Sequence, residues 1–449
     1  MNKRNRRERE RLMLFTEISD LNKNRTVVLA EDGSIYTMGA EKASEFEAEL
    51  RKKESDLDCA LSFSDKRLKK IVILLTDKCN LRCRYCYLDY GNYENKECLS
   101  NINVLDVTGI LDVIYRRFPE GIGYIQFFGG EPLIAYGEIK EIVQYIKETC
   151  REQGCELPKY GLVSNGLLLD EKKMNFFDEN HVEVMISMDG DAAIHDAVRF
   201  GINRTPTFEI IAENVRILTK THKLFFEMTL NRTHILAYRD GIVREWLDTL
   251  KSLGFAAGNV GIIEMSKDPA LDLLPEDFPV FQNIEADIID YFFKEFDKLD
   301  AMYHIDIFRV LMRLLRKQTN AYSCGAGISQ LTVSTDGKIL PCPKYAGLGF
   351  DMEISDTAWD NSRIAEVVWN EYKTGCQGCW ARQLCIGYCY SLKYRNKAND
   401  RNLLGRCWHV REMNRNIAQQ IVWFKESGRL PVLIENIHKF DTVIKKYEE

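Results

Sequence analysis

Three cysteines stand within eight residues directly after an apolar run, and this feature constrains the chain more than any other. The run Ile71–Leu75 predicts a buried strand, and Cys79, Cys83 and Cys86 follow it at the spacing C-x-x-x-C-x-x-C. Thiolates are soft ligands that suit zinc, Cu(I) and iron–sulfur clusters, and three at one loop leave one metal position open. Structural zinc normally takes a fourth ligand, but the nearest histidine is His181, far along the chain.

Composition and charge place the chain among ordinary globular proteins. It has 449 residues, of which 45% are hydrophobic and 29% charged, enough for two or three domains. The formal net charge is −6, which gives no support to a nucleic-acid partner. No apolar run approaches the roughly 18 residues of a membrane span, and the charged start MNKRNRRERERLMLF lacks the apolar core of a secretory signal. We therefore expect a cytoplasmic protein with no membrane partner.

From about residue 70 to residue 265, apolar strand patterns alternate with amphipathic helix patterns. Such alternation predicts a parallel sheet with helices outside, and six units fit a partial (β/α)6 barrel. The fold class is therefore α/β, with active residues expected at the carboxyl ends of the strands. The expected strands are Ile71–Leu75, Tyr124–Phe128, Tyr160–Ser164, Val182–Ser187, Phe225–Leu230 and Ala257–Ile263.

Polar turns follow the second, third and fourth of these strands. The turns are Gly129–Pro132, which reads GGEP, then Asn165-Gly166, and then a turn that contains Ser187 and Asp189. Each turn alone is common chemistry, since Gly, Asn and Asp favour turns. Because they stand in order at successive strand ends after the cysteine loop, we expect them to form one site with it.

The C-terminal part of the chain holds a second group of cysteines. Of the 14 cysteines, seven lie between positions 324 and 407. In a chain without a secretory signal, clustered cysteines indicate metal more often than disulfides, and zinc is the ordinary interpretation. The seven are Cys324, Cys342, Cys376, Cys379, Cys385, Cys389 and Cys407.

The cysteine loop resembles that of the radical S-adenosylmethionine (SAM) enzymes. Cys79, Cys83, Tyr85 and Cys86 match the family pattern C-x-x-x-C-x-aromatic-C. The resemblance implies that the three cysteines hold a [4Fe–4S] cluster and that the amino and carboxylate groups of SAM chelate the fourth iron.

The strand-end turns are similar to the SAM-binding pattern of the same family. The GGE motif at Gly129, Gly130 and Glu131 would receive the methionine amino group. Asn165 and Ser187 fall where the family contacts the ribose and carboxylate, and Asp189 belongs to the same turn. The resemblance extends to Arg199, which could pair a carboxylate or serve as a structural helix end, and to 261–264, at the adenine position.

The C-terminal cysteines resemble the seven-cysteine SPASM motif, which implies two auxiliary [4Fe–4S] clusters. Seven thiolates leave one of eight positions without a cysteine, so one auxiliary iron could bind a substrate thiolate, water or another side chain. Sulfatase-activating relatives carry an extra cysteine after the first position and an Asp after the second. This chain has GAGISQ and Pro343-Lys344 there, which ranks that activity low. By position, Cys376, Cys379, Cys385 and Cys407 would hold one cluster, and Cys324, Cys342 and Cys389 the other.

The remaining segments complete an expected domain plan. A charged arm, a hairpin over 26–37 and a helix over 40–53 suggest an N-terminal cap, with a leader-peptide module as the less favoured interpretation. The plan is a cap or leader-binding-like segment over 1–68, the barrel over 69–265, a helical connector over 266–320, the SPASM domain over 321–410 and a helical tail over 411–449.

The resemblance implies an oxidoreductase that cleaves SAM and uses the 5′-deoxyadenosyl radical to abstract hydrogen from a ribosomally synthesised precursor peptide. The expected product is a thioether or other cross-link, and the expected partners are that peptide and a low-potential electron donor of flavodoxin or ferredoxin type. Alternatives are a carbon–carbon cross-link, side-chain oxidation of the sulfatase-maturase kind, or action on a small molecule. A non-catalytic zinc-binding interaction protein is the alternative from another class.

Overall fold

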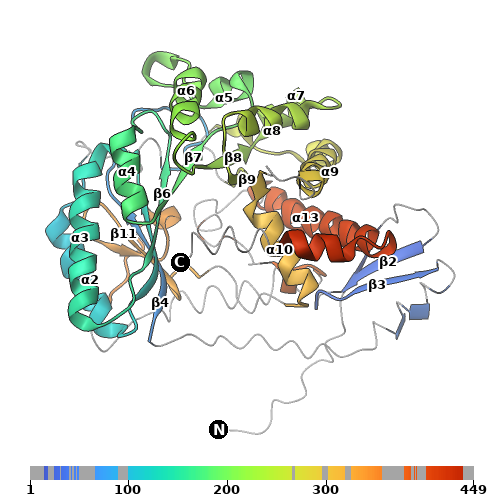
Figure 1. The fold of residues 1–449 in the computed structure, drawn as a ribbon, viewed down its shortest axis with the longest axis horizontal. Helices are drawn as coiled ribbons and strands as arrows, with labels where there is room; N and C mark the ends of the chain where they lie inside the picture. The colour runs from blue at the N-terminus through green and yellow to red at the C-terminus, as the bar shows by residue number, and fades with distance from the viewer. Residues whose placement is uncertain are drawn as a thin grey trace, which may run out of the picture.

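The computed structural model describes most of the barrel and parts of the flanking segments (Figure 1). The predicted charged arm over 1–13, and the cysteines Cys324 and Cys376, lie outside the described residues. The described residues are 15–18, 25–30, 32–39, 42, 45, 46, 48, 49, 66–88, 100–264, 268–295, 302–318, 325–355, 379–385, 389, 391 and 401–437.

Six parallel strands form the centre of the molecule, as the alternating pattern predicts. Each strand pairs with the next in chain order, so the curved sheet is a partial barrel. Buried and half-buried side chains alternate along β7 and β8, because one face of the sheet lies under helices and the other faces the barrel interior. The strands are β4 (Leu68–Leu74), β5 (Ile122–Phe128), β6 (Lys159–Ser164), β7 (Val182–Ser187), β8 (Phe225–Leu230) and β9 (Ala257–Ile262).

Amphipathic helices cover the outer face of this sheet (Figure 1). In α8, for example, Trp246, Leu247 and Leu250 are buried on one side of the helix. A 3₁₀ turn that begins at Pro132 and is capped by Glu131 precedes α3. The helices are α2 (Val104–Arg117), α3 (Tyr136–Gln153), α4 (Glu171–Glu179), α5 (Ala192–Val198), α6 (Phe208–Leu218), α7 (Arg232–Ala237) and α8 (Ile242–Ser252).

The sheet extends beyond the six expected strands at both edges. At one edge, β10 (Tyr303–His304) pairs in parallel with β9. At the other, β11 (Gln330–Val333) pairs in parallel with β4 and forms a hairpin with β12 (Ile339–Leu340). The hairpin turns at Gly337, whose φ of 75° favours glycine. The start of the C-terminal cysteine region is thus a strand of the barrel sheet.

A buried polar contact joins this hairpin to the start of the cysteine loop. The hydroxyl of Thr335 lies 2.8 and 2.9 Å from the two carboxylate oxygens of Asp77. Both residues are buried, and they are far apart in sequence. The contact therefore fixes the hairpin against the loop that follows β4.

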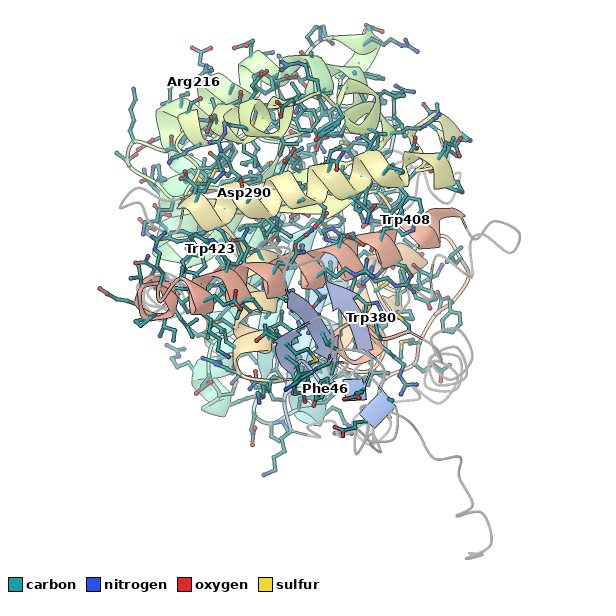
Figure 2. The ribbon with its side chains drawn as sticks, turned by 90° about the vertical axis from the view of Figure 1, so that its right-hand side faces the viewer. Phe46, Arg216, Asp290, Trp380, Trp408 and Trp423 are labelled. Atoms are coloured by element: carbon teal, nitrogen blue, oxygen red, sulfur yellow. The ribbon has the colours of Figure 1, made fainter. Side chains whose placement is uncertain are left out.

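Three helices close the open side of the barrel. They are α9 (Phe278–Glu295), α10 (Ile305–Leu315) and α13 (Arg401–Glu426). The helix α13 packs against α9 and α10, and Figure 2 shows it alongside α9, with Trp408 and Trp423 toward its two ends. The ring of Trp408 lies 4.7 Å from that of Phe278. The ring of Phe424, in the predicted C-terminal tail, lies 6.0 Å from that of Phe293 of α9, so this tail is part of the core packing.

The N-terminal segment forms a small antiparallel sheet, as the hairpin pattern predicts. Its strands are β1 (Phe15–Ile18), β2 (Arg25–Ala30) and β3 (Ile35–Gly39), and β2 contacts α13. Phe46, from the expected helix, packs its ring on Tyr36 at 4.9 Å. Within the described residues, no helix is long and apolar enough to cross a membrane.

Replacement of Thr335 by Val tests the contact between hairpin and loop. The variant keeps the shape of the side chain but removes the hydroxyl donor to the buried Asp77 carboxylate. We expect the free energy of unfolding to fall by about 1–3 kcal/mol, measured by urea denaturation. Thr249→Val, at an exposed position of α8, is the control and should change it by less than about 0.5 kcal/mol. Equal effects in the two variants would contradict the contact.

Candidate functional site

The cysteine loop is held in place by backbone pairing with the segment that follows α5. The amide of Arg82 donates to the carbonyl of Phe200 (2.7 Å), and that of Arg84 donates to the carbonyl of Val198 (2.8 Å). Inside the loop, the amide of Cys86 donates to the carbonyl of Cys83 (3.0 Å). The loop therefore lies along a fixed edge of the barrel.

One cavity of about 1430 Å³ joins the predicted site residues from both halves of the chain. The cysteine loop and the strand-end turns line one side of it, and side chains of α10, α13 and the C-terminal cysteine region line the other. Asp189 does not line it. The predicted residues that do are Cys79, Cys83, Cys86, Gly129, Gly130, Glu131, Asn165, Ser187, Arg199, Cys385 and the stretch 261–264.

The two glycines of the GGEP turn allow the end of β5 to touch the cysteine loop. A Cβ atom on Gly130 would lie 2.2 Å from the carbonyl oxygen of Lys78, and one on Gly129 would lie 2.7 Å from that of Thr76. The amide of Gly130 donates to Thr76, and the amide of Glu131 donates to Lys78, both at 2.8 Å. Only glycine fits so close an approach, so this turn fixes the base of the cysteine loop.

Glu131 is 1% exposed, and its carboxylate is bound on both oxygens. One oxygen accepts from the amide of Leu133 (3.0 Å) and the hydroxyl of Ser164 (2.8 Å), and the other accepts from the amide of Asn165 (2.8 Å). Burial raises the pKa of this carboxyl, while these donors favour its charged form. The side chain therefore ties β5 to β6 and keeps acceptor capacity for one further donor at the cavity.

Asn165 joins the end of β6 to the cysteine loop. Its side-chain nitrogen donates to the side-chain oxygen of Asn80 (2.7 Å). Its side-chain oxygen accepts from the backbone amide of Leu167 (3.0 Å). Two successive strand ends thus contact the loop directly.

Tyr85, Asp189 and Arg199 form a hydrogen-bonded group beside the cysteines, in which Tyr85 and Arg199 line the cavity. Arg199 donates to the hydroxyl of Tyr85 (2.6 Å), and this hydroxyl donates to the carboxylate of Asp189. The other Asp189 oxygen accepts from the amide of Thr229 (2.8 Å), at the end of β8. Asp189 is fully buried, so it supports the site from outside the cavity. Tyr85, the aromatic residue of the loop, connects Asp189 to Arg199.

Burial disfavours the charged form of the loop thiols. It raises the pKa of Cys79 to about 11 and that of Cys83 to about 12, partly offset at Cys83 by the nearby charge of Arg199. Ligand thiols must be deprotonated, so a metal centre with its own positive charge would stabilise them here. No group of three metal-ligating side chains in the described residues converges on a single-ion position. The thiols instead line a wide cavity, which fits a cluster and a ligand on it.

Inward-facing strand residues make the floor of the cavity polar. Burial, with the nearby Asp306, raises the pKa of Glu227 on β8 to about 8. Burial, with the nearby Arg309, lowers that of Lys70 on β4 to about 8. No motif in the sequence indicates these two residues, although a polar side chain inside an otherwise apolar strand is the signal that could have found them.

Five of the C-terminal cysteines lie in the described residues, namely Cys342, Cys379, Cys385, Cys389 and Cys407. Burial raises the pKa of Cys407, and the nearby thiols of Cys385 and Cys379 contribute to this shift. Cys389 lies near Lys344, which follows Cys342 by two positions, and both of these cysteines are buried. Of the five C-terminal cysteines that the structure describes, Cys385 alone lines the main cavity.

An ionic cluster stands between the barrel and the C-terminal region. Glu264, just after β9, accepts from Lys344 on one carboxylate oxygen and from Arg406 of α13 on the other. All three line the cavity. Lys344 thus brings a cation into the site. It belongs to the Pro343-Lys344 pair, which differs from the sequence expected of sulfatase-activating relatives.

Replacement of Gly130 by Ala tests the close approach of turn and loop. The added methyl group must displace the backbone at Lys78, so we expect a loss of about 1–3 kcal/mol in stability and less iron retained per chain. Gly137→Ala, in α3 with no atom within 4 Å of the new Cβ, is the matched control. Calorimetry and iron analysis measure both effects. Normal iron content and stability in Gly130→Ala would show that the contact does not constrain the loop.

Comparison with known proteins agrees with this geometry. Residues 73–235 match the radical SAM superfamily. The chain is 25% identical over 351 residues to a cysteine-type anaerobic sulfatase-maturating enzyme of Clostridium novyi, covering 75% of this chain and 91% of that one. It is 23% identical over 372 residues to the subtilosin biosynthesis protein AlbA of Bacillus subtilis, covering 77% and 72%.

Solved structures share the fold. The structure of anSMEcpe with bound AdoMet and Cp18Cys peptide superposes with a TM-score of 0.61 at 18% identity, covering 83% of this chain and 99% of that one. SuiB of Streptococcus suis, bound to the precursor peptide SuiA, gives a TM-score of 0.52 at 13% identity, covering 86% and 96%. Residues 73–235 therefore form a radical SAM domain, and the chain shares its fold with solved maturase structures.

Proposed function

We propose that the chain cleaves SAM reductively and modifies a ribosomally made precursor peptide, forming a thioether or other cross-link. One observation carries the proposal: a single cavity of about 1430 Å³ connects the cysteine loop, the strand-end turns and the C-terminal cysteine region. A cofactor at the loop and a peptide entering from the C-terminal side would therefore meet in the same space.

The residues around the loop suit the family's cofactors. Cys79, Cys83 and Cys86 would hold the [4Fe–4S] cluster, and Glu131 has acceptor capacity for the methionine ammonium of SAM. Asn165 and Ser187 supply amide and hydroxyl partners for a ribose. When bound, the cluster and SAM supply a 5′-deoxyadenosyl radical, which abstracts hydrogen from the substrate.

The supporting residues position these groups and do not themselves react. Arg199 and Tyr85 fix the loop through hydrogen bonds that lead to the buried Asp189. The turn at Gly129 and Gly130 holds the base of the cysteine loop in place. The surrounding barrel limits the access of water, which protects a reactive species from side reactions.

Two further [4Fe–4S] clusters would lie on the C-terminal side. Cys379, Cys385 and Cys407, with Cys376, would hold one, and Cys324, Cys342 and Cys389 the other. Cys385 lines the cavity, and Cys389 is near Lys344, which also lines it, so both clusters would lie beside the substrate space. This arrangement supports a role in taking up the remaining electron or in orienting a substrate thiolate.

A second candidate is side-chain oxidation of the sulfatase-maturase kind. It is favoured by the similarity to sulfatase-maturating enzymes over 75% of the chain. The cation of Lys344, bound to Glu264, stands close to the position where those relatives carry an Asp. This difference in charge supports the cross-linking proposal, and a carbon–carbon bond is the other cross-link that fits.

The test is reaction of the anaerobically reconstituted enzyme with SAM, dithionite and the peptide encoded beside its gene. We expect 5′-deoxyadenosine and a peptide that has lost two hydrogens per cross-link, measured by mass spectrometry. Cys83→Ala should abolish both products, whereas Cys155→Ala, outside both cysteine groups, should retain them. SAM cleavage with an unchanged peptide mass would refute the peptide-modifying function.

Replacement of Glu264 by Gln tests the ionic cluster. The variant keeps the side-chain volume but removes the charge that binds Lys344 and Arg406. Because charged hydrogen bonds contribute about 1.5–3 kcal/mol, we expect peptide modification to fall by about 10- to 100-fold. Formation of 5′-deoxyadenosine without peptide should change by less than about twofold.

The control for this variant is Glu245→Gln, at an exposed ion pair with Arg239 on the outside of the barrel. It should leave both reactions unchanged. A parallel loss of SAM cleavage in Glu264→Gln would instead assign this carboxylate to the SAM site, where the family contacts adenine.

A further inference from the structure

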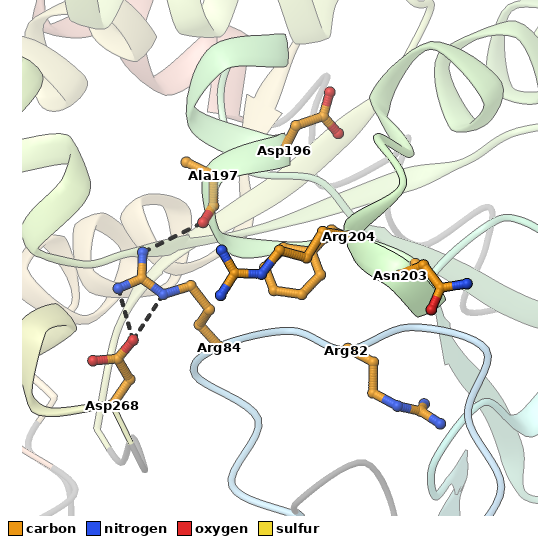
Figure 3. Close-up of a pocket in the computed structure, with 9 residues that line it drawn as sticks. Arg82, Arg84, Asp196, Ala197, Asn203, Arg204 and Asp268 are labelled. Atoms are coloured by element: carbon orange, nitrogen blue, oxygen red, sulfur yellow. Dashed lines mark hydrogen bonds and ion pairs between the residues drawn. The ribbon is translucent and has the colours of Figure 1, made fainter.

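A second pocket, of about 900 Å³, lies on the outer side of the cysteine loop (Figure 3). Three arginines, Arg82, Arg84 and Arg204, contribute to its lining, together with Asp196 and Asp268. None of its lining residues lines the main cavity, so it is a separate site.

Only the thickness of the loop separates this pocket from the thiols. Cys83 lines the main cavity, and its two neighbours Arg82 and Arg84 line the outer pocket, as alternation along an extended segment requires. The guanidinium of Arg82 also donates to the carbonyl of Cys79 (2.8 Å) and to that of Leu81 (2.7 Å). A molecule seated in the outer pocket would therefore contact the backbone that carries the cluster ligands.

The two carboxylates of the pocket are already bound. Asp268 binds Arg84 at 2.7 Å. Asp196 accepts from the amides of Thr207 and Phe208, at the start of α6, where a negative charge is favourable. Arg204 has no carboxylate partner among the described residues. Its cation lies 5.8 Å from the ring of Phe200, so the pocket presents positive charge on a chain of net charge −6.

The backbone is constrained where it presents this charge. Asn203 and Arg204 have φ of 62° and 58°, values that non-glycine residues rarely adopt. Hydrogen bonds from Gly201 to Thr205 and from Thr205 to Ile202 close the turn around them. Strained backbone that the surroundings hold in place is typical of functional surfaces.

The neighbouring surface is suited to a protein partner. Ile202 is 55% exposed beside Arg204, and Asn203 and Arg204 are exposed as well. An exposed apolar side chain with adjacent arginines is a composition that protein interfaces favour. A small free anion would use the arginines but would gain nothing from Ile202.

We propose that this outer pocket is the docking surface for a small acidic electron-carrier protein of flavodoxin type, which reduces the loop cluster through the segment of Arg82 to Arg84. The proposal rests on the proposed function. In the transfer, the reduced carrier loses one electron and the cluster gains one, with no bond made or broken. The positive pocket attracts the acidic carrier over a distance and orients it toward the loop.

The first test measures binding of a purified flavodoxin to the full-length chain, at low and at physiological ionic strength. We expect Arg204→Glu to weaken binding by about tenfold at low ionic strength, because the substitution places a like charge against the acidic partner. The difference should shrink as salt screens it. Arg216→Glu, at an exposed arginine of α6 outside the pocket, is the control and should stay within about twofold. Equal affinities for Arg204→Glu and Arg216→Glu would overturn the proposal.

The second test compares two reductants for the same variants. With flavodoxin as the donor, the rate of SAM cleavage should fall in Arg204→Glu and persist in Arg216→Glu. With dithionite, which needs no docking surface, both variants should match the parent. If the unmutated protein did not cleave SAM with dithionite, the proposed function would be contradicted. The comparison of flavodoxin affinities would still show whether the outer pocket is the docking surface. Loss of the dithionite-driven rate in Arg204→Glu would overturn the docking role.

Discussion

The contact between the GGEP turn and the cysteine loop is the constraint on which the rest of the site depends. At Gly130 a Cβ atom would lie 2.2 Å from the backbone of Lys78, so β5 and the loop are in direct backbone contact. Two amide-to-carbonyl bonds of 2.8 Å fix their relative position. Glu131 then extends this contact to β6, and Asn165 returns it to the loop through Asn80. A flexible cysteine-rich loop is thereby given the geometry of the rigid sheet, which is what a cluster site requires.

Much of this could be predicted from the sequence, because local patterns decide it. Strand and helix alternation predicts the parallel barrel, and β7 and β8 occupy the predicted residues. The addition of β10 and β11 to the sheet could not be predicted, since two short strands pair through contacts distant in sequence. For the same reason the sequence did not indicate that Asp189 acts from behind the loop. Its partner Tyr85 lies 104 positions away. The cluster of Glu264, Lys344 and Arg406 likewise depends on where α13 packs.

The cysteine loop divides two environments with different charge. On its inner side, burial holds the thiols of Cys79 and Cys83 in their neutral form in the absence of a metal. On its outer side, Arg82 and Arg84 face a solvent-accessible pocket. Alternation of side chains along one short segment is enough to create both faces. A single loop can thus hold a cofactor toward the barrel and present a surface to another protein.

The most direct test of the central claim is the metal content of anaerobically purified protein, with iron, acid-labile sulfide and zinc measured together. We expect three four-iron clusters, and hence about twelve irons per chain. The triple variant Cys79/Cys83/Cys86→Ala should contain about four fewer, because only the loop cluster is lost. Zinc in place of iron, or equal iron in parent and variant, would contradict the assignment of the loop as a cluster site.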